Sequence, residues 1–291
     1  MKVIKLKSPA KINVRLDVLN KRHDGYHDLR MINTPVSIYD EIECELTEKG
    51  IKVECMNDSN VPDGEENIVY GVAKEILAYS NKNIGVHIRI KKNIQSAAGM
   101  GGGSSNAAAV LTGLNDLLKI NLSKEKLMKI GLRFGADVPF FVMGAPAVAK
   151  GVGEDLVKIK KMPKLPLVVI TPNIPVSTKW AYEHFEAAND NRAPEPVNKD
   201  GSNDIPIQFA TKKSVIKYLN NDLERVTIKK YPVVTDLKRV LEKTGALAAQ
   251  MTGSGPTVFG IYPNKEMAEI ACKKIQAKVS DCRVFLAENL S

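Results

Sequence analysis

Residues 99–105 have the sequence Gly-Met-Gly-Gly-Gly-Ser-Ser, and they lead directly into Asn-Ala-Ala-Ala-Val-Leu at residues 106–111. Glycine places no side chain between the backbone amides and an approaching group, and it readily adopts the positive φ angles that a ring of N–H groups requires. Downstream, apolar residues recur at helical spacing on one face: Ala107, Val110, Leu111, Leu114, Leu117 and Leu118. We expect Ser104 or Ser105 to be the N-cap of this helix.

A glycine turn that leads into a helix favours a phosphate ligand, because free amides and the positive end of the helix dipole meet at one point. The alternative is a tight turn with no ligand. A Walker A loop fits poorly, because it needs Lys-Ser or Lys-Thr where Ser104 and Ser105 follow Gly103. A dinucleotide fingerprint also fits poorly, because it needs a third glycine at position 104 and a strand directly before the turn. The stretch therefore predicts phosphate binding of another kind.

The composition is that of an ordinary globular protein, with 291 residues, 44% hydrophobic and 26% charged. This length favours one large domain or two of ordinary size.

No run approaches the ~18 apolar residues of a membrane span, and the N-terminal residues lack a signal-peptide core, so we expect a cytoplasmic protein. The cysteines have no Cys-x-x-Cys spacing, which argues against zinc or a redox pair: Cys44, Cys55, Cys272 and Cys282.

The chain is basic, with 42 Lys and Arg against 33 Asp and Glu and a net charge of +9. This excess favours anionic partners such as nucleotides, phosphorylated metabolites or nucleic acid. The alternative is a basic surface that only keeps the protein in solution. Nucleic acid is disfavoured because the lysines are dispersed and aromatic residues make up only 5% of the chain.

The N-terminal half is expected to alternate strands and helices. The expected strands are 3–6, 13–18, 41–46, 51–55 and 86–90. Two of them, 41–46 and 51–55, are predicted to form a hairpin across the polar turn 47–50, in which Cys44 and Cys55 could face each other. One helix is predicted to begin near Asn67, and another to be capped by Ser123 and to end near Gly135.

Residues 165–171 form a buried-type strand that is expected to open a second domain. We therefore divide the chain into an N-terminal domain, 1–160, which carries the phosphate loop, and a C-terminal domain, 161–291. Residues 187–205 are predicted to be a long surface excursion. The later elements are expected to be a helix at 235–244, strands at 246–251 and 257–262, a helix at 265–277 and a strand at 282–287. This order predicts an α+β sandwich with helices on a mostly antiparallel sheet.

Three further segments carry candidate functional residues. Lys11 lies where an N-terminal strand begins, and is either a solvated surface lysine or a functional cation. Asp137 lies past the end of a predicted helix among apolar residues, and is either a satisfied turn residue or a poised base. The small-residue cluster 251–257 joins two predicted strands, either as a plain tight hairpin or as a further source of amides for an anion.

Together, residues 9–13, 97–109 and 250–260 resemble the three signature motifs of the GHMP kinase superfamily. Two further stretches narrow the resemblance: Lys-Arg-His-Asp-Gly-Tyr-His-Asp-Leu at 21–29, and residues 135–141 with 150–154 downstream. They resemble the branch that phosphorylates the 2-hydroxyl of 4-diphosphocytidyl-2-C-methyl-D-erythritol in the non-mevalonate isoprenoid pathway. The resemblance covers about residues 7–286. It implies a two-domain α+β fold, with an N-terminal ribosomal-protein-S5-domain-2-like domain and a C-terminal ferredoxin-like α/β sandwich.

The resemblance also implies roles for individual residues. Asp137 matches the catalytic base, and Lys11 the lysine that pairs with it and with the reacting oxygen. The ATP site is implied to comprise Asn67 and Lys92 together with Gln95, Ser96, Ala97, Ala98, Gly99, Met100, Gly101, Gly102, Gly103, Ser104 and Ser105. The substrate site is implied to comprise Asn13, Tyr26, His27, Thr178 and Tyr182. Tyr26 and Tyr182 would enclose the cytosine ring, with Trp180 as a rival to Tyr182.

The implied cofactors are ATP and Mg²⁺, and no carboxylate is assigned as a metal ligand. Ser104 or Ser105 could hold the ion, or phosphates and water could.

Position 106 is Asn where many relatives carry Asp, and Gln95-Ser96 stands where Pro-x is common. The expected partner is the small-molecule substrate, with no nucleic acid, no membrane, and a monomer or weak homodimer.

Two rival functions stay open at this point. One is another GHMP kinase, acting on mevalonate, homoserine or a sugar; Tyr26-His27 argues against it, because only a substrate that carries a nucleotide needs an aromatic shelf beside an imidazole. The other is a basic nucleic-acid-binding protein on a related scaffold, because fold alone does not settle function.

Overall fold

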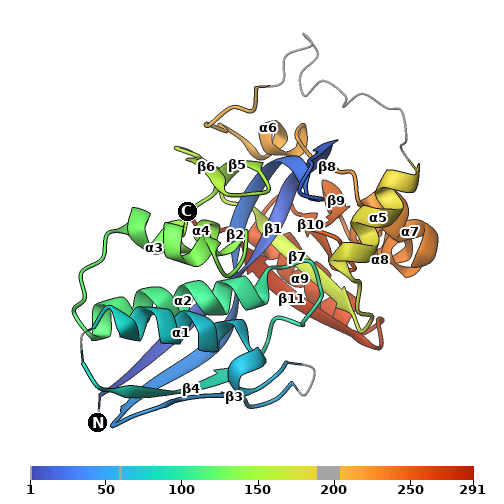
Figure 1. Cartoon of the computed structure of the whole chain (residues 1–291). Coiled ribbons are helices and arrows are strands. Elements are labelled where there is room, and N and C mark those ends of the chain that lie inside the picture. The colour runs from blue at the N-terminus through green and yellow to red at the C-terminus, as the bar shows by residue number, and fades with distance from the viewer. Residues whose placement is uncertain (1, 59–60, 81, 189–203) are drawn as a thin grey trace. The chain divides into compact units, whose positions relative to one another are not determined.

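A computed structural model describes residues 2–58, 61–80, 82–188 and 204–291 as two compact units (Figure 1). The first unit comprises Met1–Ala10, Ile38–Ser96 and Gly101–Gly144, and the second comprises Lys11–Ser37, Ala97–Met100 and Ala145–Ser291. Two long strands, β1 (Val3–Lys21) and β2 (His27–Thr47), contribute to both. The units therefore interleave along the chain, whereas our division at residue 160 is linear and stays a prediction.

In the first unit, strand β4 (Gly85–Lys91) lies between β2 and β3 (Ile51–Cys55). It runs antiparallel to β2 and parallel to β3, and Val86 is the register partner of both Leu46 and Ile51. The predicted hairpin of β2 with β3 is therefore wrong, and Cys44 and Cys55 lie on strands that are not neighbours.

Side chains of β4 contact glutamates on both neighbouring strands. Strand β2 carries Glu43 and Glu45, and β3 carries Glu54. With β4 between them, Arg89 binds Glu43 and Glu45 of β2 at 2.7 and 2.9 Å, and His87 lies 2.5 Å from Glu54 of β3. A non-local pairing of opposite charges thus replaces the local hairpin.

The helices of the first unit are α1 (Ile68–Ala78), α2 (Gly102–Leu117), α3 (Lys124–Leu132) and α4 (Val138–Met143), with the short 3-10 helix Gly64–Glu66 before α1. The predicted start of α1 near Asn67 and the predicted cap of α3 are confirmed: Asn67 accepts the amide of Val69, and Ser123 accepts that of Lys126. Helix α3 ends at Leu132, earlier than the predicted end near Gly135, and α4 was not predicted.

The predicted N-cap of α2 is wrong. The cap is Gly101, with a φ of 69°, and the Ser105 amide donates the first intrahelical bond to the Gly101 carbonyl. Only glycine adopts this left-handed conformation without strain, so the chain can enter the helix before either serine. The hydroxyl of Ser105 is used elsewhere, as described below.

The second unit contains a four-stranded antiparallel sheet with the order β11-β7-β10-β9, whose strands are Cys282–Glu288, Pro166–Pro172, Val258–Ile261 and Ala248–Met251. Helices α8 (Val233–Lys243) and α9 (Lys265–Gln276) complete a β-α-β-β-α-β unit. This is the ferredoxin-like arrangement that the resemblance implied. The sandwich predicted from residues 165–287 is confirmed.

The remaining elements of the second unit had not been predicted: β5 (Ala147–Gly151), β6 (Asp155–Lys158), α5 (Thr178–Ala188), α6 (Lys212–Ile216), β8 (Asn220–Asn221) and α7 (Glu224–Lys230). The two expected strands at 3–6 and 13–18 are parts of the single strand β1.

Most of the predicted surface excursion at 187–205 lies outside the described residues. Among the helices of the described ranges, none is long and apolar enough to span a bilayer.

All four cysteines are free thiols. Burial raises the pKa of the Cys44 thiol to about 12 and also raises the pKa of Cys272. A buried thiol with a raised pKa stays protonated at neutral pH and packs as a small apolar group.

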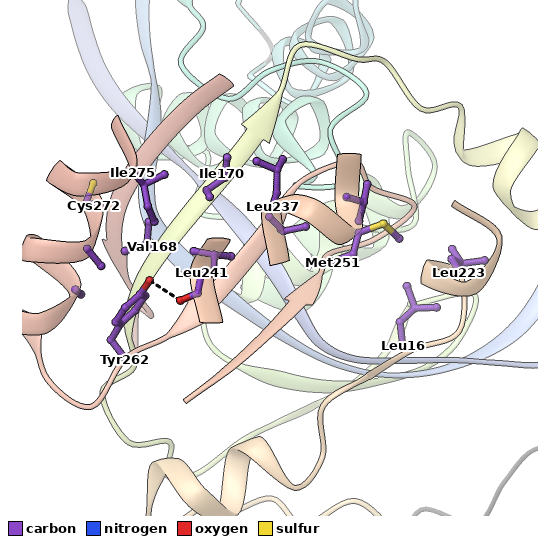
Figure 2. Packing of buried hydrophobic residues seen from close by; sticks show 14 of the residues in the cluster. Leu16, Val168, Ile170, Leu223, Leu237, Leu241, Met251, Tyr262, Cys272 and Ile275 are labelled. Carbon is purple, nitrogen blue, oxygen red and sulfur yellow. Dashed lines mark hydrogen bonds between the residues drawn. The ribbon is translucent and has the colours of Figure 1, made fainter. Parts of the chain in front are cut away.

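The core of the second unit is apolar and joins α8, α9 and the four-stranded sheet (Figure 2). Leu241 and Leu237 of α8 belong to the same cluster as Val168 and Ile170 of β7. Tyr262 is buried beside them, and its hydroxyl donates to the Leu241 carbonyl at 3.3 Å. Burial raises the pKa of Tyr262, so this donor keeps its proton at neutral pH.

Truncation of this core should destabilise the protein. Leu241 is 0% exposed, and Leu241→Ala should lower the free energy of unfolding by about 2–5 kcal/mol, because a cavity is left. Urea denaturation of this variant and of Leu247→Ala checks the expectation. Leu247 is 50% exposed, and its substitution should change stability by less than about 0.5 kcal/mol. Equal effects of the two substitutions would contradict the assigned core.

Candidate active site

The start of α2 in the first unit presents backbone donors. The amides of Gly102, Gly103 and Ser104 precede the first intrahelical bond, so helix geometry gives them no acceptor within α2. A Cβ added at Gly103 would meet nothing within 4 Å, which shows that the space beside this residue is open. Bare amides at the positive end of a 16-residue helix suit a phosphate group.

The two serines of the stretch have different environments. The Ser105 hydroxyl is buried, donates to the Pro9 carbonyl at 2.6 Å and accepts from Ser8 at 2.7 Å. Ser104 is partly exposed, and its hydroxyl lies 3.4 Å from the position that a Cβ would take on Gly135. Of the two, Ser104 is therefore the serine that can turn toward a ligand.

A bound Mg²⁺ would depend mainly on its nucleotide. Within the described ranges, no group of three or more His, Cys, Asp or Glu side chains could hold a metal ion. Mg²⁺ is often held by one or two protein groups together with phosphates and water. A single hydroxyl at Ser104 beside bound phosphates fits that chemistry.

Asp137 lies at the N-cap position of α4 and is partly exposed. Its neighbour Val138 packs against Gly131 of α3, and Gly135 lies beside Ser104 at the start of α2. The first unit thus brings the Asp137 segment next to the helix start that carries the free amides.

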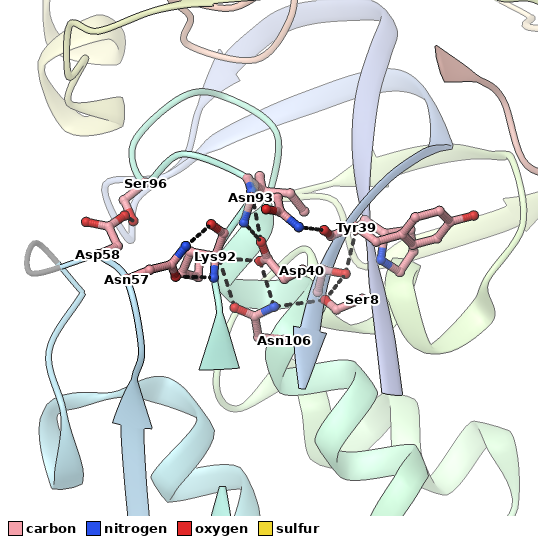
Figure 3. A network of polar contacts seen from close by, with 12 residues as sticks. Ser8, Tyr39, Asp40, Asn57, Asp58, Lys92, Asn93, Ser96 and Asn106 are labelled. Carbon is pink, nitrogen blue, oxygen red and sulfur yellow. Dashed lines mark hydrogen bonds and ion pairs between the residues drawn. The ribbon is translucent and has the colours of Figure 1, made fainter. Parts of the chain in front are cut away.

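Two of the predicted nucleotide residues have their side chains bound within the protein. Asn67 caps α1, and its amide donates to the Pro62 carbonyl at 2.8 Å. Lys92 is 3% exposed, and its ammonium binds the carboxylate of Asp40 and, at 3.0 Å, the amide oxygen of Asn106 (Figure 3). Their predicted proximity to the nucleotide stays a prediction.

In the second unit, β1 carries a chain of buried polar contacts. The Lys11 ammonium donates to Asn13 Oδ1 at 2.6 Å, and Asn13 Nδ2 donates to Asn33 Oδ1 at 2.7 Å. The backbone amide of Asn13 donates to the Thr252 hydroxyl at 2.9 Å. These contacts fix the direction of the Lys11 side chain.

The small-residue cluster 251–257 links β9 to β10, as predicted, and lies against residues 97–100 of the same unit. A Cβ on Gly99 would lie 2.3 Å from the Thr252 carbonyl oxygen, and a Cβ on Gly253 would lie 2.7 Å from the Gly99 carbonyl oxygen. Both residues also have positive φ angles, 74° and 58°. Only glycine fits at either position, and the close contact holds the first part of the glycine stretch.

The aromatic residues of α5 have separate partners. Tyr182 stacks on His27, with ring centroids 5.3 Å apart and an angle of 15°. Trp180 packs instead on His184, at 4.5 Å, with the Lys230 ammonium 4.3 Å above its ring. Tyr182 therefore packs against the predicted substrate residue His27, whereas Trp180 packs against His184 and Lys230.

The other two predicted substrate residues also lie in the second unit. Thr178, one helical turn before Tyr182, lies 3.1 Å from Ser254 between hydroxyl oxygens. Tyr26 is 64% exposed, beside His27 in the chain. The unit thus brings together the Lys11–Asn13 strand, residues 97–100, the cluster at 251–257 and the stacked pair of His27 with Tyr182.

Sequence reasoning missed Asp40 and Asn33 and saw Thr252 only as part of a turn. All three are buried polar residues. No local signal marks them in the sequence, because Asp40 is followed directly by Glu41 and Asn33 by Thr34.

Models of the GHMP kinases N terminal domain and of the GHMP kinases C terminal domain match residues 67–145 and 211–281. A 4-diphosphocytidyl-2-C-methyl-D-erythritol kinase of Geobacter metallireducens is 48% identical over 276 residues, which cover 94% of this chain and 95% of that protein. The chain belongs to the 4-diphosphocytidyl-2-C-methyl-D-erythritol kinase family. A second family member, from Geobacter sulfurreducens, is 45% identical and covers 96% of both chains.

Solved structures agree with this membership of the 4-diphosphocytidyl-2-C-methyl-D-erythritol kinase family. A crystal structure of a 4-(cytidine 5'-diphospho)-2C-methyl-D-erythritol kinase aligns with a TM-score of 0.78 at 28% identity, covering 99% of this chain and 100% of that one. A homoserine kinase from Cytophaga hutchinsonii, at 19% identity and a TM-score of 0.73 over 99% and 96% of the two chains, shows the fold alone. The predicted superfamily, the two-domain GHMP kinase fold and the class of small-molecule kinase are confirmed.

The open space at Gly103 allows a sharp test of the phosphate loop. Gly103→Ala should leave the free energy of unfolding unchanged or raise it by up to about 1 kcal/mol, because alanine favours a helix and meets no neighbour. The same methyl should weaken ATP binding by about tenfold or more, because it occupies the space that a phosphate would fill. Thermal unfolding and calorimetric titration measure the two effects. Unchanged ATP affinity in the folded variant would show that the loop is a structural turn.

Proposed function

We propose that this chain transfers the terminal phosphoryl group of ATP to the 2-hydroxyl of 4-diphosphocytidyl-2-C-methyl-D-erythritol, in the non-mevalonate route to isoprenoid precursors. The observation that carries the proposal is the stacked pair of His27 with Tyr182, which suits a base-bearing substrate in a chain with a GHMP glycine loop. The proposed setting is the cytoplasm, with the chain as a monomer or weak homodimer.

Phosphoryl transfer asks a protein mainly to position the reactants and to stabilise charge. The amides of Gly102, Gly103 and Ser104 bind the phosphates of ATP, and the Ser104 hydroxyl would help to hold Mg²⁺. When bound, Mg²⁺ neutralises negative charge on the phosphate oxygens. The Lys11 ammonium, held by Asn13 Oδ1 at 2.6 Å, stabilises charge on the reacting oxygen.

Asp137 acts as the base in this proposal. Its carboxylate takes the proton of the substrate hydroxyl as the new oxygen–phosphorus bond forms. The bond from the γ-phosphorus to the bridging oxygen breaks at the same time, and ADP leaves with that oxygen. The position of Asp137 just after Gly135, which lies beside Ser104, supports this role.

The cytidine half of the substrate lies on the aromatic residues of the second unit. Tyr26 and Tyr182 offer ring faces, and base–aromatic stacking contributes about 1–3 kcal/mol per base. The imidazole of His27 recognises the hydrogen-bonding edge of cytosine. Asn13 and Thr178 complete the polar contacts with the substrate.

A coupled assay of ADP release tests this function. The chain should release ADP with the cytidine-diphosphate substrate and should be at least about 100-fold slower with methylerythritol, mevalonate, homoserine or galactose, because these lack the base. Equal turnover of methylerythritol with and without its cytidine diphosphate would overturn the assigned substrate. Salt-dependent binding to polyanions without kinase activity would favour the nucleic-acid alternative.

Removal of the base should slow the chemical step. Asp137→Asn should lower kcat by about 10²–10⁴-fold, because the amide cannot accept the hydroxyl proton. ATP affinity should change by less than about threefold, since the loop amides remain in place. Single-turnover kinetics and calorimetry measure these values. Turnover within a few-fold of the wild type would remove Asp137 from the mechanism.

Two aromatic residues of α5 provide a matched pair of variants. Tyr182→Ala should raise KM for the cytidine substrate by about 10–100-fold and leave KM for ATP unchanged, because a stacking surface is lost. Trp180→Ala should change both by less than about threefold, since Trp180 packs on His184 and Lys230. A larger rise in the Trp180 variant would reverse the assignment.

A further inference from the structure

A buried carboxylate of the first unit accepts hydrogen bonds from Asn93 and Asn106 (Figure 3). Asp40 of β2 is 0% exposed. Its Oδ1 accepts the backbone amides of Asn93 and Ile94 at 2.7 and 2.8 Å, and its Oδ2 accepts Asn106 Nδ2 at 2.9 Å and the Lys92 ammonium. One side chain thus receives four donors.

These donors lie on both sides of the glycine stretch in the sequence. Asn93 and Ile94 come directly before Gln95, and Asn106 comes directly after Ser105. The carboxylate therefore ties the chain that enters the stretch to the helix that leaves it. Asn57 adds to the entry side, since its side chain bonds both the amide and the carbonyl of Lys92, at 2.7 and 2.9 Å.

The network also reaches the start of α2. The Lys92 ammonium lies 3.1 Å from the position that a Cβ would take on Gly102, the first residue of the helix. Asn106 donates to Ser8 at 2.9 Å, and Ser8 donates to Ser105 at 2.7 Å. Lys92, which binds Asp40 and Asn106, thus lies beside the first residue of α2, and Ser8, which accepts from Asn106, bonds Ser105 in the first turn.

Charge makes Asp40 necessary to this arrangement. A buried ammonium beside the positive end of a helix dipole is unfavourable unless an anion compensates it. Asp40 is the carboxylate bound to Lys92. Without its charge, the Lys92 ammonium would face the amide of Asn106 and the helix start unpaired.

We infer that Asp40 is a positioning residue for ATP: its carboxylate, acting through Lys92 and Asn106, holds the amides of Gly102, Gly103 and Ser104 in the direction that a phosphate requires. This inference rests on the proposed function of the loop. It assigns to Asp40 an effect on nucleotide binding that a contribution to stability alone would not produce.

Asp40→Asn tests the inference, because asparagine keeps the shape but places an amide donor where the carboxylate met Lys92 or Asn106. Calorimetry with a non-hydrolysable ATP analogue and Mg²⁺, well below the unfolding temperature, should show affinity reduced by about 10–100-fold. Affinity for the cytidine substrate should change by less than about threefold. Asn106→Ala, which keeps the ion pair of Lys92 with Asp40, should lower nucleotide affinity by about 3–10-fold.

Two control variants separate positioning from stability. Glu41→Gln removes an exposed ion pair between Glu41 and Lys91, the sequence neighbours of Asp40 and Lys92, and should change neither stability nor binding. Asp17→Asn removes a buried carboxylate that binds Arg15 and Arg30 at 2.7 and 2.6 Å in the second unit. It should lower the unfolding temperature as Asp40→Asn does and leave nucleotide affinity within about threefold of the wild type.

The outcomes distinguish the inference from the proposed function. Wild-type nucleotide affinity in folded Asp40→Asn or in Asn106→Ala would overturn the inference and leave the function intact. Loss of nucleotide affinity in Asp17→Asn equal to that in Asp40→Asn would also overturn it, because destabilisation alone would then explain the loss. A wild-type chain that binds no nucleotide would overturn the proposed function itself.

Discussion

A phosphate loop made of glycines cannot hold its own shape. The absence of side chains at residues 101–103 leaves their amides accessible, but it also removes the contacts that these residues could make through side chains. The shape must therefore come from buried polar groups outside the loop. In the first unit this group is Asp40, which fixes the chain at 93–94 and the helix at Asn106. In the second unit, Thr252 and Gly253 close against Gly99.

The same constraint connects the loop with the groups assigned to catalysis. Thr252, which contacts Gly99, also accepts the amide of Asn13, and Asn13 holds the ammonium of Lys11. In the other unit, Ser104 of the loop helix lies beside Gly135, just before Asp137. Lys11 is thus linked through Asn13 to Thr252, which contacts the loop, and Asp137 lies two residues after Gly135, which lies beside the loop residue Ser104. Rigid placement of this kind is what phosphoryl transfer demands of a protein.

The sequence predicted elements whose signals are local. Asn67 before an apolar run specified α1, and the alternating strands and amphipathic helices after residue 165 specified the sandwich. The start of α2 was placed too late because the positive φ of Gly101, unlike a serine cap, has no side-chain signature. The β2–β3 hairpin failed because its alternative, β4 between the two strands, depends on a pairing of charges across distant segments.

The residues that shape the site could not be predicted for the same reason. Asp40 meets Lys92 across 52 positions of sequence and Asn106 across 66, and Thr252 meets Asn13 across 239. The hydrophobic periodicity of a short segment carries no information about contacts between residues so far apart in the sequence. The glycine loop itself was visible because four glycines within five residues at the start of a helix are a local signal. The resemblance to GHMP kinases supplied roles for Lys11 and Asp137 that spacing alone left open.

Backbone amide NMR gives the most direct test of the central claim that this loop receives the phosphates of ATP. A non-hydrolysable ATP analogue with Mg²⁺ would be titrated into ¹⁵N-labelled protein, and the shifts of every assigned amide would be followed. We expect the largest saturable shifts at Gly102, Gly103 and Ser104, the amides that precede the first bond of α2. Saturable binding with these three amides unmoved would contradict the claim.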